Sequence, residues 1–92
     1  MNKIQLDEKD STLVEKYFYE SESLKTILDI LSKNMAETNQ QLSDVFDKYS
    51  EYYKNSRASL EIAKNEVFAK YLSGIKIDRY TFDFANCELY YG

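Results

Sequence analysis

The chain has 92 residues, of which 43% are hydrophobic, and a formal net charge of −4. This length and apolar content predict one globular domain spanning residues 1–92 and exclude a disordered chain. The acidic balance argues against non-specific nucleic-acid binding, and without a long apolar run we expect no membrane contact and no signal peptide. Because Cys87 is the only cysteine, we expect a cytoplasmic location.

Residues 1–10 are predicted to form an N-terminal arm or an edge strand, because "KIQL" alternates between apolar and polar positions. The first helix is predicted over residues 11–33, with apolar side chains recurring every three or four positions. Its start is indicated by Thr12 and Glu15, which fit a capping box. The polar segment "ESES", residues 20–23, interrupts the apolar pattern.

A second, longer helix is predicted over residues 34–73. Asn34 and Glu37 fit another capping box, so we expect a tight turn between the two helices. One uninterrupted helix is the alternative, because neither glycine nor proline forces a break. A bend or break near residues 54–59 is a further alternative, since "KNSRAS" offers little apolar cover. Gly74 is the predicted left-handed stop of this helix.

Residues 75–92 are predicted to form a β-hairpin, because β-branched and aromatic residues alternate there and Ala85 and Asn86 are suited to a turn. An isolated hairpin is marginal in water, so it needs a third strand from "KIQL" or packing against a helix. The predicted fold class is therefore mainly α: an antiparallel helical hairpin with a long second helix plus a small C-terminal β-hairpin, an α+β arrangement.

A turn close to residue 33 sets a register in which Phe46 lies opposite Glu20 and Ser21. Large rings would then fill the space beside small side chains. Two tyrosines, Tyr19 and Tyr52, lie off the apolar seam, so we expect them to be exposed. With nearby acids they form the predicted partner-binding face: Glu15, Tyr19, Glu22, Glu51 and Tyr52.

In that register the first helix covers the second only as far as residue 56. The seam of the second helix continues beyond this point with nearly the heptad spacing of a coiled coil. Leaving large apolar side chains in water would lose roughly 1.5–3 kcal/mol of stabilising free energy for each side chain. Either the C-terminal strands or another chain must therefore cover the predicted oligomer interface: Leu60, Ala63, Val67, Phe68 and Tyr71.

Residues that carry catalytic or ligand chemistry are scarce. The sequence has no histidine, and its two glycines, Gly74 and Gly92, cannot form a phosphate-binding loop. Without a base, Cys87 is interpreted as a small apolar strand residue rather than a nucleophile. Zinc ligands and calcium-loop spacing are also missing. We therefore predict no enzyme activity, no cofactor and no metal site.

These observations predict a non-enzymatic protein–protein interaction module that acts as a homodimer or as a subunit of a complex. One alternative is a small acidic inhibitor of phage or plasmid origin that blocks a host macromolecule, including by DNA mimicry. The second alternative is a structural or secreted helical-hairpin subunit. In size, the predicted hairpin resembles the WXG100-type secreted proteins, although its turn, "SKNMAE", lacks their Trp-x-Gly.

Overall fold

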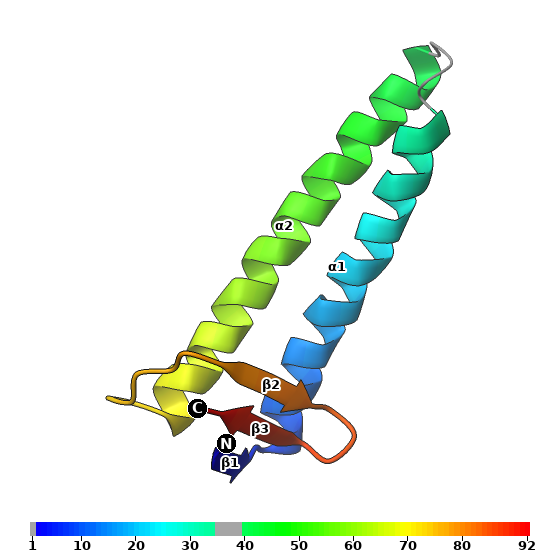
Figure 1. Cartoon of the computed structure of the whole chain (residues 1–92). Coiled ribbons are helices and arrows are strands. Elements are labelled where there is room, and N and C mark those ends of the chain that lie inside the picture. The colour runs from blue at the N-terminus through cyan, green and yellow to red at the C-terminus, as the bar shows by residue number, and fades with distance from the viewer. Residues whose placement is uncertain (1, 35–39) are drawn as a thin grey trace. The chain divides into compact units, whose positions relative to one another are not determined.

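The computed structural model describes residues 2–34 and 40–92, apart from the side chains of residues 40–42 (Figure 1). Two packed helices and a small antiparallel sheet make up the described chain, which confirms the predicted fold class. In chain order the elements are β1 (Asn2–Gln5), α1 (Glu8–Asn34), α2 (Gln40–Tyr71), β2 (Tyr80–Asp83) and β3 (Glu88–Tyr91). The predicted capping box at Asn34 and Glu37 lies partly outside the described residues.

The chain divides into two compact units. The first, which we call the sheet unit, contains Met1–Lys16 and Glu61–Gly92. The second, the hairpin unit, contains Tyr17–Leu60, in which the described segments of α1 and α2 run antiparallel (Figure 1). Residues 54–59 lie within α2 without interruption, so the helix has no break there. Because neither proline nor glycine occurs in that segment, little opposes helix continuation.

The three strands of the sheet unit are ordered β1–β3–β2, and both pairs are antiparallel. The register places Leu89 between Ile4 of β1 and Phe82 of β2, so these three side chains form a row on one face. Leu89 is completely buried. The third strand expected from "KIQL" is therefore present, and it gives the C-terminal hairpin the support that an isolated hairpin lacks.

The connection between β2 and β3 is a turn, as predicted, and it includes Ala85 and Asn86. Asp83 organises it, because its carboxylate accepts hydrogen bonds from the backbone and side-chain nitrogens of Asn86 at 3.3 and 2.9 Å. Cys87 belongs to this turn rather than to the strand, and its φ of 52° lies in the left-handed region. Gly74 also has a positive φ, 80°, as expected for the residue that stops α2.

Helix α1 begins one turn earlier than predicted, at Glu8, so the capping box at Thr12 and Glu15 is wrong as the helix start. Asp7 precedes the helix, and its carbonyl accepts the first turn's hydrogen bond from the backbone N–H of Ser11 at 3.0 Å. Aspartate is as good a residue at this position as threonine. Helix α1 therefore starts after a residue that is suited to the cap position.

The seam of the second helix beyond residue 56 is buried within the chain, which agrees with the first of the two alternatives that the sequence left open. Leu60, Ala63 and Val67 are 2%, 3% and 4% exposed. In the sheet unit, Phe68 is half-buried and its ring contacts the rings of Tyr80 and Phe82, with centroids 5.2 and 6.2 Å apart. Within the sheet unit, strand β2 thus supplies cover for Phe68 that the first helix was not expected to give.

Candidate protein-binding groove of the helical hairpin

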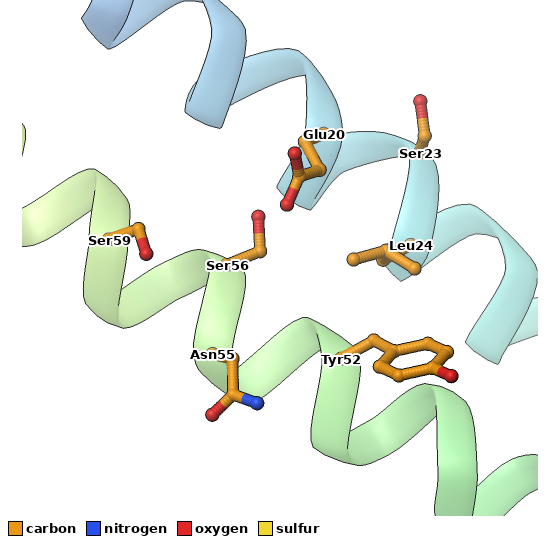
Figure 2. A pocket seen from close by; sticks show the side chains of 7 residues that line it. All are labelled: Glu20, Ser23, Leu24, Tyr52, Asn55, Ser56 and Ser59. Carbon is orange, nitrogen blue, oxygen red and sulfur yellow. The ribbon is translucent and has the colours of Figure 1, made fainter.

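The two polar gaps of the helices, "ESES" and "KNSRAS", lie beside the same groove in the hairpin unit (Figure 2). Glu20 and Ser23 line it from α1, and Asn55, Ser56 and Ser59 line it from α2. The predicted register, which set Phe46 opposite Glu20 and Ser21, is therefore wrong. Its error follows from placing the turn near residue 33, whereas α1 continues to Asn34 and the described part of α2 begins at Gln40.

The groove has a volume of about 450 Å³. It exists because short side chains face one another across the helix interface where larger ones would fill the space. Leu24 of α1 and Tyr52 of α2 form its apolar wall (Figure 2). Among its described lining residues, Glu20 is the one that carries a charge. The full lining is Glu20, Ser23, Leu24, Tyr52, Asn55, Ser56 and Ser59.

Ser56 is the unusual member of this lining. Its side chain is 3% exposed, and within the described part of the chain its Oγ has no hydrogen-bond partner. Ser21 is equally buried, but its Oγ donates to the carbonyl of Phe18 at 2.9 Å. A buried hydroxyl without a partner costs about 1–3 kcal/mol. Figure 2 shows the Ser56 hydroxyl directed between the helices, so a donor can reach this buried atom only if the side chains around it move apart.

An apolar strip continues from the groove along both helices of the hairpin unit. On α1, Ile27 and Ile30 follow Leu24 at helical spacing, and on α2, Val45 precedes Tyr52 by seven positions. Ile30, Tyr52 and Val45 are 54%, 46% and 39% exposed, whereas Leu24 and Ile27 are half-buried. We call these five residues the apolar strip.

The hairpin unit has almost no apolar core of its own. Within its described residues, the side chains that are fully buried are Ser21, Ser56 and Leu60. Two of the three are serines, which contribute little hydrophobic stabilisation. The apolar surface of this unit is therefore mostly half-buried or exposed, and a partner that covers it would remove much of that surface from water.

The predicted partner-binding residues do not gather at one place. Tyr52 lines the groove, with its ring edge-on to Tyr49 at 5.7 Å and Lys48 Nζ 5.9 Å from its centroid. Tyr19 is exposed as predicted and contacts the Phe18 ring, but it does not line the groove. Glu22 and Glu51 are exposed and also lie outside the lining, while Glu15 belongs to the sheet unit and is half-buried.

The predicted oligomer-interface residues instead belong to the chain's own interior contacts. Beyond the buried Leu60, Ala63 and Val67, Tyr71 donates a hydrogen bond to Asp10 Oδ2 at 2.7 Å. Their role in association stays a prediction, but the uncovered seam that suggested it is not present.

The groove itself was not predicted from the sequence. The sequence feature that indicates it is the pair of polar gaps, one on each helix.

The sheet unit contains a polar network that joins the start of α1 to the end of α2. Lys70 Nζ contacts Asp10 Oδ2 at 2.8 Å and Asp7 Oδ2 at 3.3 Å. The hydrogen bond from Lys70, followed by that from Tyr71, lowers the pKa of Asp10, and the same two carboxylates raise the pKa of Lys70. Because these groups are largely exposed, solvent screens the ion pairs, and each pair contributes little to the free energy of unfolding. We interpret the network as a structural link between the two helix ends.

A second cation of this unit, Lys64, is almost buried. Its Nζ donates to the Tyr80 hydroxyl at 2.7 Å and pairs with Glu61 Oε1 at 2.7 Å. Burial lowers its pKa, but the hydrogen bonds that Lys64 donates to Glu61 and Tyr80 outweigh that effect, so the net shift is upward. Lys64 is therefore held as a cation and is unsuited to act as a base.

Within residues 2–34 and 40–92, no group of three or more histidine, cysteine, aspartate or glutamate side chains is placed to bind a metal ion. None of the described helices combines the length and apolar character needed to cross a membrane. Compared with known proteins, the chain matches no protein-family model, no curated protein and no solved structure.

Proposed function

We propose that the chain is a non-enzymatic protein–protein interaction module whose groove and apolar strip receive a helical segment of another protein. The observation that carries this proposal is the buried, unpartnered hydroxyl of Ser56 at the floor of an open groove. Free in solution, this hydroxyl is costly, and a bound polar group would recover that cost.

A helix suits the groove for geometric reasons. Helices pack about 8–10 Å apart, depending on the size of the side chains between them. Ser23, Ser56 and Ser59 are short enough to let a third helix approach closely at the centre of the groove. The apolar strip then offers contacts to side chains that recur every three or four positions on the incoming helix, the usual pattern of helix-in-groove recognition.

The test is site-specific photo-crosslinking in the cells that naturally make the protein. Replacing Tyr52 with p-benzoylphenylalanine keeps an aromatic ring in the groove and should yield a discrete crosslinked species, identified by mass spectrometry. Tyr19 is the matched control position, because it is also an exposed tyrosine of the hairpin unit but lies outside the groove lining. Its crosslinks should be fewer and non-specific.

A discrete crosslink from position 52 to another protein supports the proposed interaction through the groove, whereas a crosslink to a second copy of this chain would show self-association instead. Crosslinking that is equal at positions 19 and 52, or absent at both, contradicts the proposal. The acidic-inhibitor and structural-subunit alternatives stay predictions, and a crosslink to a nucleic-acid-binding enzyme would favour the first of them.

A further inference from the structure

We infer that the groove recognises an arginine side chain of the partner segment. This inference rests on the proposed interaction through the groove. The groove has a polar end, formed by Glu20 and Ser56, and an apolar wall, formed by Leu24 and Tyr52. An arginine side chain has the same two-part character, with a planar cationic head on an apolar stem.

Charge complementarity selects a cation. Glu20 supplies the charge in the described lining of the groove, and that charge is negative. Its carboxylate points toward the side of the groove where Ser56 lies (Figure 2). Lys48, the cation beside Tyr52, precedes Ser56 on α2 by eight positions, about 12 Å along the helix axis. Lys48 therefore lies about two helical turns from Ser56.

The number of acceptors favours arginine over other cations. A guanidinium group has five N–H donors in a fixed plane and no acceptor. The Glu20 carboxylate of α1 and the Ser56 hydroxyl of α2 are acceptors from both helices. A guanidinium N–H placed between the helices would give Ser56 Oγ the partner that it lacks. The bond to a carboxylate is charge-assisted and so stronger than one between neutral groups.

The apolar wall completes the match. The methylene stem of an arginine can lie against Leu24, while Tyr52 offers an aromatic ring of the kind that guanidinium groups stack on. An apolar side chain of the same length would fill the wall but would leave Ser56 and Glu20 facing it without compensation. The groove should therefore discriminate between charged and neutral side chains of identical shape.

The experiment is an NMR titration of the ¹⁵N-labelled full chain with N-acetyl-arginine amide as the probe. The comparison probe is N-acetyl-citrulline amide, which has nearly the same shape and no charge. We expect saturable shifts of the backbone signals of Ser23, Tyr52 and Ser56, with a dissociation constant on the order of 1 mM for so small a ligand. Citrulline should bind at least about fivefold more weakly, because it forms no charge-assisted bond.

Two variants assign this preference to the groove. Glu20→Gln keeps the size of the side chain and should remove the difference between the two probes. Glu22→Gln is the matched control, since it neutralises an exposed acid of the same helix outside the groove lining. It should leave the arginine preference unchanged.

Equal shifts with both probes, or a preference that survives Glu20→Gln, would overturn the inference. If neither probe shifts the groove signals but position 52 crosslinks a protein in cells, the arginine inference falls and the proposed function stands. If the probe binds as expected while position 52 gives no crosslink, the proposed function falls, and with it the claim that the arginine comes from a partner.

Discussion

The hydroxyl of Tyr71 donates a hydrogen bond to Asp10 Oδ2 at 2.7 Å and accepts one from the backbone N–H of Asp7 at 2.9 Å. One side chain near the end of α2 thus satisfies both a carboxylate and one of the unpaired backbone donors at the start of α1. This bridge fixes where α1 begins.

Replacing Tyr71 with phenylalanine keeps the ring and removes both bonds. We expect a loss of about 1 kcal/mol in the free energy of unfolding, measured by urea denaturation, because the site is only half-buried and water replaces part of the interaction. Tyr52→Phe is the control and should change the unfolding free energy by less than about 0.5 kcal/mol. Equal effects of the two substitutions would show that the bridge contributes nothing.

Asp10 makes the stability of the sheet unit depend on pH. Its pKa lies below the ordinary value because Lys70, and then Tyr71, donate hydrogen bonds to the charged carboxylate. A lowered pKa means stabilisation that is complete above the unfolded-state pKa of about 3.9 and is lost as pH falls through the folded-state value. The difference in urea midpoint between wild type and Asp10→Asn should be largest near neutral pH and shrink below about pH 4.

The exposed Asp29 is the control for that titration. The difference in urea midpoint between wild type and Asp29→Asn should be small at each pH tested, because substitutions of exposed side chains change stability little. If the Asp10→Asn difference were equally constant, the ion pair with Lys70 would not couple protonation to folding.

Cys87 occupies a left-handed backbone conformation that costs a residue with a Cβ atom roughly 1–2 kcal/mol. Glycine removes that cost but gains conformational freedom in the unfolded chain, worth about 0.5–1 kcal/mol. We therefore expect Cys87→Gly to raise the melting temperature slightly or leave it unchanged, and Cys87→Val to lower it. A lower melting temperature for the glycine variant than for the valine variant would contradict this ranking.

Leu89 is the centre of the sheet and is completely buried between its neighbours on β1 and β2. Truncation to alanine should reduce the free energy of unfolding by about 2–5 kcal/mol, through lost burial and the cavity that remains. Ile75→Ala is the matched control, because Ile75 is about half exposed, and it should have little effect. Thermal unfolding of the two variants side by side distinguishes a packed sheet from a loosely attached one.

The elements of this fold were predictable because they depend on local patterns. The helical spacing of apolar residues, the left-handed glycine at position 74 and the alternation after it each act over a few residues. The "KIQL" strand was also visible as an alternation. These features predicted the helical hairpin and the C-terminal strands.

The register between the helices was not predictable to the same degree. Asp7 and Thr12 are both suitable first-turn caps, and the choice between them is made by contacts from Lys70 and Tyr71, more than fifty positions away. The turn was placed too early by a capping pattern at Asn34. Because the misplaced turn displaced one helix along the other in the predicted register, the two polar gaps were not aligned, and the groove at Ser56 was missed.

The pairing of β1 with β3 has a consequence for the order in which the chain folds. Its register joins Asn2 to Tyr91 and Gln5 to Glu88, almost the full length of the sequence apart. Strand pairs that close such long loops form late, whereas the β2–β3 hairpin closes locally and can serve as their template. Ile4→Ala should therefore accelerate unfolding in stopped-flow experiments while leaving the folding rate nearly unchanged, which makes the first strand the last part of the protein to fold.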